Sequence, residues 1–192
     1  LKSVYMIFSR KLVKPIHPNL YLGGTQLKKV ESHTHLGLTL TSSLSWDEHI
    51  KKVGNKSSKC VGLLKRISSK APRQCLENLY KTMIRPVMEY CDVIFDGAPA
   101  VHLNLLDKVQ REAAITCTGA YRHTSDDALE NELGWEPLSL RRTRHKATMM
   151  YKILNNLVPR YLRNLCPPIL EDIVPYYLRN QEDIRPPRQK TE

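Results

Sequence analysis

The sequence lacks a stretch of about 18 apolar residues, the length that a membrane-spanning helix needs. It has no CxxC or CxxH pair, no P-loop and no hydrolase triad. Its five cysteines are odd in number and widely spaced, which is typical of reduced thiols in an intracellular protein. We therefore predict a protein of the nucleus or cytoplasm that does not enter a membrane.

Acidic residues are also scarce. Lys and Arg number 30 against 19 Asp and Glu, so the formal net charge is +11. Hydrophobic residues make up 41% of the chain, which is enough to form a core. This charge balance predicts a polyanionic partner, with nucleic acid first and a membrane surface as the rival interpretation.

The hydrophobic periodicity predicts an α+β protein that is predominantly α. Residues 1–42 contain a short apolar run of strand-forming residues, 4–8, and a Gly23-Gly24 turn, as expected for short strands and a hairpin. His35–Leu40 should be a strand with Leu36, Leu38 and Leu40 on one face. After Ser45 the period changes to that of helices, which predicts a helical region over 43–119, a further helical segment over 120–168 and an extended tail over 169–192.

Helix boundaries and inner faces can be predicted in the same way. Ser45 should cap the first helix, with Glu48 completing a capping box. Pro86 should kink the second helix. Apolar steps of three and four place the following positions of the first two helices inward: Trp46, Ile50, Val53, Ser57, Cys60, Leu64 and Ile67, then Leu76, Tyr80, Met83, Val87, Tyr90 and Ile94.

The first helix carries a row of cations. At about 100° per residue, Lys52, Lys56, Lys59, Arg66 and Lys70 fall within a roughly 80° stripe, centred about 110° from the apolar seam, with Lys51 nearby. The stripe runs for roughly 25–30 Å and contains no acid, whereas solvated faces usually mix charges of both signs. It predicts contact with a nucleic-acid backbone.

A second group of cations follows later in the sequence. Arg141, Arg142, Arg144, Lys146 and Lys152 lie in a predicted helix that has no acid between Leu138 and Leu157. Leu140 and Leu157 should belong to its inner face. The group is either a second phosphate-binding surface or a contact with acidic protein surface, and the sequence leaves both open.

No metal site or active site is predicted. His33 and His35 would share one face of a strand, but no third ligand is near. Asp126 and Asp127 are explained as favourable charge in the first turn of a short helix. The residues taken alone therefore indicate a basic helical binding module.

Several blocks nevertheless resemble non-LTR, jockey-like or LINE-type, retrotransposon reverse transcriptases. The resemblance begins with residues 21–24, His35-Leu36-Gly37-Leu38-Thr39-Leu40 and 44–50. It continues through residues 79–91, 106–114 and 177–180, with Leu133-Gly134-Trp135-Glu136-Pro137-Leu138 followed by Arg141-Arg142. The blocks occur in order along nearly the whole chain, and they resemble the end of the polymerase palm followed by the thumb.

The resemblance implies roles for particular residues. Lys2 is similar to a lysine proposed to assist pyrophosphate departure as a general acid. His35, Leu36 and Gly37 stand where a primer-grip strand would hold the primer end. The cation-bearing helix would then lie against a template–primer duplex of RNA and DNA.

The family's aromatic-x-Asp-Asp motif, which holds the catalytic Mg²⁺, is absent from the sequence. The chain starts at Leu1 in a strand pattern, so we expect a C-terminal fragment whose palm and fingers lie upstream. We expect no cofactor in this chain and no polymerase activity from it alone, while the parent enzyme would need Mg²⁺. The alternative is a non-enzymatic, retrotransposon-derived module that binds nucleic acid or protein, and the reading frame upstream of Leu1 distinguishes the two.

Overall fold

The computed structural model describes residues 3–9 and 17–166. Short strands at the N-terminal end are followed by a multi-helix region, which confirms the predicted α+β, predominantly α class. The chain separates into two compact units, residues 1–142 and 143–192. The candidate functional site lies in the first unit.

The strands form three small two-stranded pairings. β1 (Val4–Tyr5) pairs in parallel with β4 (Lys28–Lys29). β2 (Tyr21–Leu22) and β3 (Thr25–Gln26) form the hairpin predicted from Gly23 and Gly24. Both glycines have positive φ, 55° and 77°, which a two-residue turn of this kind requires. The predicted hairpin is therefore confirmed.

A second hairpin leads into the helices. β5 (Ser32–His35) pairs antiparallel with β6 (Leu38–Thr41), with Thr34 opposite Thr39. Leu36 and Gly37 form its turn, with φ values of 46° and 82°. The prediction of one strand through His35–Leu40 is therefore wrong: Leu36 is 77% exposed in the turn, and Thr39 is the buried residue. Glycine after leucine was the missed signal, because a two-residue turn needs positive φ at both positions.

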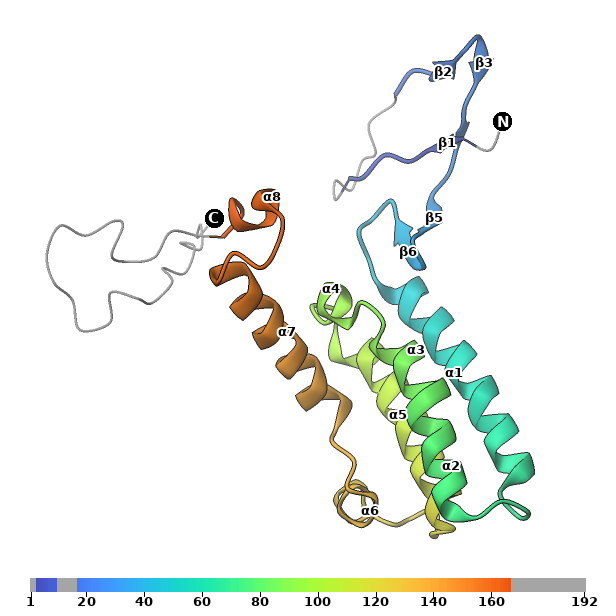
Figure 1. The fold of residues 1–192 in the computed structure, drawn as a ribbon. Helices are drawn as coiled ribbons and strands as arrows, with labels where there is room; N and C mark the ends of the chain where they lie inside the picture. The colour runs from blue at the N-terminus through green and yellow to red at the C-terminus, as the bar shows by residue number, and fades with distance from the viewer. Residues whose placement is uncertain (1–2, 10–16, 167–192) are drawn as a thin grey trace, which may run out of the picture. The chain divides into compact units, whose positions relative to one another are not determined.

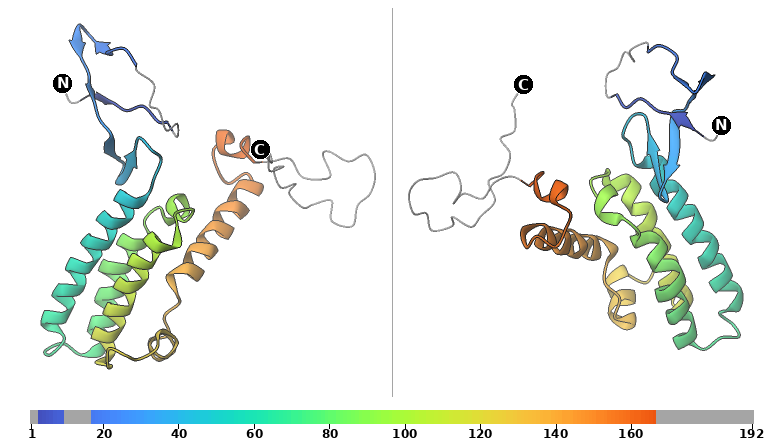
Figure 2. Two further views of the ribbon diagram at one scale, coloured as in Figure 1. Left: turned by 180° about the vertical axis from the view of Figure 1, so that it is seen from behind. Right: turned by 45° about the horizontal axis from the view of Figure 1, so that its top comes forward.

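Three helical rods make the body of the first unit. α1 (Asp47–Ile67) and α5 (Ala100–Thr118) run in the same direction and pack side by side, as both views show (Figures 1 and 2). Between them in sequence, α2 (Arg73–Leu79), η1 (Tyr80–Ile84) and α3 (Arg85–Glu89) run in the opposite direction. We call these three segments the helical arm. A short α4 (Asp92–Phe95) connects the arm to α5.

The start of α1 differs from the predicted capping box. Trp46 is the N-cap residue and makes no side-chain cap hydrogen bond. The Ser45 hydroxyl still accepts from the Asp47 N–H at 3.2 Å. The carboxylate of Glu48 instead accepts from the hydroxyl of Ser32 in β5 at 2.8 Å. This contact uses the predicted capping residue to attach the hairpin to the helix.

The helical arm contains a π-helical turn. At η1 the Arg85 N–H donates to the Tyr80 carbonyl, five residues back. The wider turn delays the helical phase, so Ile84 and Met88 take the inward positions predicted for Met83 and Val87. Met83 is 54% exposed. The π turn lies directly before Pro86, which stands at the start of a new helical segment. The kink predicted at this proline stays a prediction.

The core lies where α1, the arm and α5 meet. In α5 the inward-facing residues Leu103, Leu106, Val109, Ala113 and Cys117 are all buried. Ala114 of α5 is buried as well, and the other buried apolar side chains come from α1, the arm, α4 and residues 129–138: Ile50, Val61, Leu64, Leu76, Tyr80, Ile84, Met88, Phe95, Leu129, Leu133, Trp135 and Leu138. Burial in this core raises the pKa of the Cys117 thiol to about 12, so that thiol stays protonated.

α6 (Asp126–Leu133) closes the core with its buried Leu129 and Leu133. Ser125 caps it by accepting from the Ala128 N–H, and Gly134 ends it in the left-handed conformation. Trp135 then stacks on Tyr80 with ring centroids 3.8 Å apart. α7 (Leu138–Leu154) begins beside this stack, and its residues up to Arg142 belong to the first unit.

The second unit contains the rest of α7 and α8 (Arg160–Arg163). In α7 the buried residues are Leu138 and Arg142, so the prediction that Leu140 faces inward is wrong: it is 50% exposed. The tail predicted over 169–192 lies outside the described residues. No helix in the described part of the chain is long and apolar enough to cross a membrane.

Candidate nucleic-acid interface

The basic row consists of Lys52, Lys56, Lys59, Arg66 and Lys70, and all five side chains are exposed. They are spaced along α1 as predicted. The buried stripe of the helix, however, lies at a different angle from the apolar seam that the sequence predicted. It is centred on Ile50, Gly54, Ser57, Val61 and Leu64. At about 100° per residue the row then lies roughly 160° from the stripe, not 110°. The row therefore projects away from the bundle and is open to a partner.

The row is shorter on the helix than predicted. α1 ends at Ile67, so the helical part runs from Lys52 to Arg66, and Lys70 lies in the following turn. At 1.5 Å per residue, the helical part is roughly 21 Å long. Among the described residues, no carboxylate pairs with Lys56, Lys59, Arg66 or Lys70. Four of the five cations therefore have no acidic partner in the part of the chain that the structure describes.

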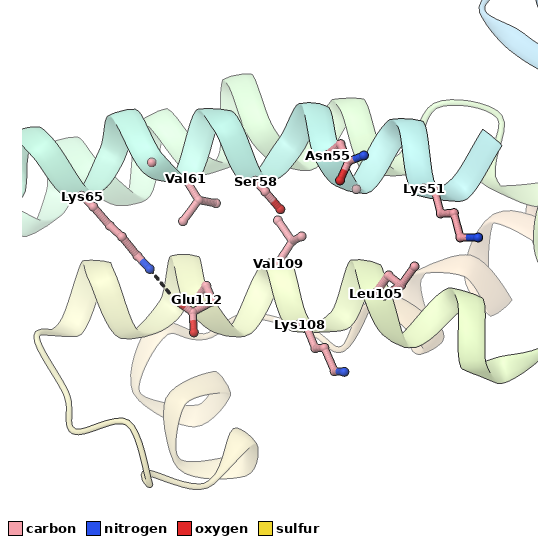
Figure 3. A pocket seen from close by; sticks show the side chains of 11 residues that line it. Lys51, Asn55, Ser58, Val61, Lys65, Leu105, Lys108, Val109 and Glu112 are labelled. Carbon is pink, nitrogen blue, oxygen red and sulfur yellow. Dashed lines mark hydrogen bonds and ion pairs between the residues drawn. The ribbon is translucent and has the colours of Figure 1, made fainter. Parts of the chain in front are cut away.

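Lys51 is separate from the row. Its ammonium lies 3.0 Å from the Asp47 carboxylate, one turn earlier, and its side chain lies on the side of α1 that faces α5. There a groove of about 440 Å³ runs between α1 and α5 (Figure 3). Lys65 crosses it to pair with Glu112, and Val61 and Val109 line it (Figure 3). Because these lysines are tied to carboxylates, the α5 side is less available to an anion.

The β5–β6 hairpin holds the first cation of the row in place. The Lys52 ammonium donates to the Thr34 hydroxyl at 3.0 Å and contacts the Thr39 hydroxyl at 3.4 Å. These two threonines face each other across the hairpin. Fixing a flexible lysine in this way reduces the entropy that it loses on binding a phosphate.

A buried histidine joins the hairpin to α1 beneath that lysine. His49 is 2% exposed, and its Nδ1 accepts from the Thr39 N–H at 3.2 Å. Its ring packs against Phe95, with centroids 5.2 Å apart. Burial, and then the positive charge of Lys52, lower the pKa of His49 below its usual 6.5. The imidazole is therefore neutral near pH 7, as its role as acceptor at Nδ1 requires.

The residues predicted as a primer-grip-like strand lie at the hairpin turn. His35 ends β5, and Leu36 and Gly37 make the turn. The turn rests on Tyr90, whose hydroxyl donates to the Leu36 carbonyl at 3.0 Å. A Cβ at Gly37 would lie only 3.1 Å from Cε1 of the Tyr90 ring. Glycine is therefore required there both for its backbone conformation and for this close approach.

The hairpin, α1 and the arm enclose a cavity of about 530 Å³, which we call the hairpin cavity. Lys52 and Lys56 line it from the basic row, and Gly37 lines it from the turn. The structure thus brings part of the basic row and part of the predicted primer-grip-like strand together at the hairpin cavity. The remaining lining residues are Thr34, His49, Val53, Thr82, Met83, Pro86, Val87 and Tyr90.

Sequence reasoning missed the residues that complete this cavity. It placed Met83, Val87 and Tyr90 in the core, whereas the π turn turns them toward the hairpin. Pro86 was a signal for this, because a proline inside a helical pattern demands a local change of backbone hydrogen bonding. Nothing in the sequence indicated the hydrogen bond between Lys52 and the Thr34 hydroxyl, because that contact depends on the register of the hairpin.

The second basic group is divided by its contacts, and its first two members are structural. Arg142 is 5% exposed; its Nε lies 2.8 Å from the Asp96 carboxylate and its Nη1 lies 3.7 Å from that of Asp107. Arg141 binds Glu89 through two guanidinium nitrogens and lies 3.3 Å from Glu136. The interpretation of these two arginines as a phosphate-binding surface is therefore corrected: they fasten the start of α7 to the bundle.

The remaining residues of that group lie in the second unit. Arg144, Lys146 and Lys152 are exposed on α7. Their role stays a prediction. Lys2, the general acid implied by resemblance, lies outside the described residues.

No group of three or more His, Cys, Asp or Glu side chains within residues 3–9 and 17–166 could hold a metal ion. His33 and His35 lie on β5, and Asp126 begins α6 and pairs with Arg111. No family model, curated protein or solved structure matches this chain. The candidate interface therefore stands on its own geometry and charge.

Proposed function

We propose that this chain is the C-terminal part, the palm end and thumb, of an RNA-directed DNA polymerase of the non-LTR retrotransposon kind. In this proposal α1 holds the template–primer duplex by its backbone. The observation that carries the gripping role is the basic row: four exposed cations on α1 and Lys70 in the turn after it, with four of the five having no acidic partner among residues 3–9 and 17–166. The polymerase assignment rests on the sequence blocks that resemble that family.

The row suits a duplex backbone for electrostatic reasons. A duplex carries one negative charge per roughly 1.7 Å of axis, so a row of roughly 21 Å passes several phosphates. Such contacts do not depend on base sequence, as a polymerase that copies any template needs. The upstream palm and fingers, and the Mg²⁺ that they hold, would belong to the parent enzyme. We expect the chain alone to incorporate no nucleotide on a primed RNA template, a result that an incorporation assay checks.

The test of the gripping role compares two triple variants that lose the same charge. Lys52→Ala/Lys56→Ala/Lys59→Ala removes three cations of the row. The matched control, Lys65→Ala/Lys81→Ala/Lys108→Ala, removes three lysines from outside the row; Lys65 and Lys81 pair with Glu112 and Glu77. Binding to a fluorescent blunt RNA–DNA hybrid is measured by anisotropy at several salt concentrations.

The row variant should bind more weakly, with a smaller slope of log K against log salt, by about 2.7 on B-form DNA for three lost phosphate contacts. The control should retain most of the affinity and slope. Equal weakening of the two variants would mean that overall charge, and not the row, drives binding. That result would reject the proposed grip.

A further inference from the structure

The hairpin cavity has a chemistry that contact with a duplex backbone does not require. One side is cationic, with Lys52 and Lys56. The other side comes from the arm and is apolar and aromatic, with Met83, Val87 and Tyr90. Phosphates on the outside of a duplex would reach the lysines without using that second side.

Two large side chains of the arm are unusually exposed at this cavity. Tyr90 is 53% exposed and Met83 is 54% exposed. The Tyr90 hydroxyl is held by the Leu36 carbonyl at 3.0 Å, so the orientation of its ring is fixed while half of the side chain stays accessible. A fixed, accessible aromatic ring beside cations is the arrangement on which unpaired nucleobases stack in single-strand binding proteins.

The volume of the cavity fits the same class of ligand. About 530 Å³ lies within the range of small-molecule sites and is sufficient for one nucleotide. Thr34 and Thr82 place hydroxyl groups at its wall. The Thr82 hydroxyl donates to the Asn78 carbonyl at 2.7 Å, so its oxygen is left as an acceptor for a ligand. Cations for the phosphate, an apolar and aromatic wall for the base, and hydroxyls for polar edges therefore meet in one cavity.

We propose that the hairpin cavity binds one unpaired nucleotide next to the duplex held by the basic row. The base lies against Tyr90 and Met83, and its phosphate is bound by Lys52 and Lys56. This inference rests on the proposed function for the position of the duplex. It adds that the chain distinguishes a duplex with a single-stranded extension from a blunt one.

The experiment uses the full 192-residue chain and four RNA–DNA hybrids of the same duplex sequence. One hybrid is blunt. The second has a one-nucleotide 3′ extension and the third a one-nucleotide 5′ extension, and the base of each extension is 2-aminopurine. The fourth carries an abasic extension at the end that binds better. We expect at least one 2-aminopurine extension to bind roughly 5- to 100-fold tighter than the blunt hybrid, the range for stacking of one base on an aromatic side chain. Its fluorescence should be quenched on binding, and the abasic extension should bind like the blunt hybrid.

Variants then locate the nucleotide. Tyr90→Leu and Met83→Gln should each bring the ratio of extended to blunt affinity toward one, whereas Tyr90→Phe, which keeps the ring, should preserve most of it. Tyr121→Leu is the matched control, because Tyr121 is 88% exposed and does not line the hairpin cavity. The ratio of extended to blunt affinity is measured within each variant. A general loss of stability would lower both affinities and leave the ratio unchanged.

Three results would overturn the inference: equal affinity for blunt and extended hybrids, equal affinity for abasic and base-containing extensions, or a ratio unchanged by Tyr90→Leu. Each of these leaves duplex binding through the row intact. If instead no hybrid binds the wild-type chain, the proposed function fails as well. The two failures are therefore distinguishable.

Discussion

Replacing Arg142 by alanine tests directly whether this arginine is structural. Its guanidinium is buried against the Asp96 carboxylate, with a side-chain exposure of 6% for Arg142 and 13% for Asp96. Removing one member of a buried ion pair takes away a main partner of the other charge, which costs about 3–5 kcal/mol. Asp107 is affected too: burial raises the pKa of its carboxyl group, and the Arg142 charge offsets part of that rise.

We therefore expect Arg142→Ala to lower the free energy of unfolding by about 3–5 kcal/mol, a large part of the 5–15 kcal/mol typical of a domain. Urea unfolding at pH 7, followed by circular dichroism, measures it. Lys152→Ala is the control, because it removes the same charge from an exposed position and should change stability by less than about 0.5 kcal/mol. A loss below about 1 kcal/mol in Arg142→Ala would refute the structural role and return this arginine to the list of candidate phosphate contacts.

Two further predictions concern α1. Gly62→Ala and Gly54→Ala should each raise the free energy of unfolding by up to about 1 kcal/mol, because glycine is a poor helix former. Both positions have room for the new methyl group. A Cβ at position 62 meets nothing within 4 Å, and one at position 54 meets Leu106 at an ordinary 3.8 Å. A loss of stability in urea unfolding for either variant would contradict this packing. The lowered pKa of His49 means that the unfolded chain takes up its proton first as pH falls, so this residue's contribution is complete above pH 6.5 and decreases below it. The wild-type chain should lose more stability between pH 7 and pH 5 than His49→Asn, and parallel pH profiles would show that His49 does not titrate in this way.

Local signals predicted most elements of the first unit. The glycine turn of the first hairpin and the short helix that begins at Asp126 depend on residues close together in the sequence, and both were predicted as observed. The exposure of the basic row also followed from local spacing. The angle between the row and the core did not follow from local spacing, because α1 packs on α5, the arm and the β5–β6 hairpin. The contact with α5 buries Gly54 and Val61, and no pattern of large apolar residues reveals a buried glycine.

The candidate site was predicted only in part, for a similar reason. Lys52 and Lys56 were visible in the sequence as cations on one face. The apolar half of the hairpin cavity was not, because Met83 and Tyr90 follow the same three-four spacing as core residues. A helical wheel assumes a constant rotation per residue, and the π turn breaks that assumption between Tyr80 and Ile84.

The π turn also means that the arm holds one residue more than a regular helix would need over the same length. Pro86 explains why the surplus is retained, since a proline cannot donate to the carbonyl four residues back and its ring collides with it. A homologous chain without a proline here can lose one codon and keep Met88 and the rest of α3 in register with the core. Comparing such sequences should therefore reveal a one-residue gap near Thr82 wherever the proline is missing. A homologue with this gap would lack the π turn, and with it the surface that exposes Met83 and Tyr90.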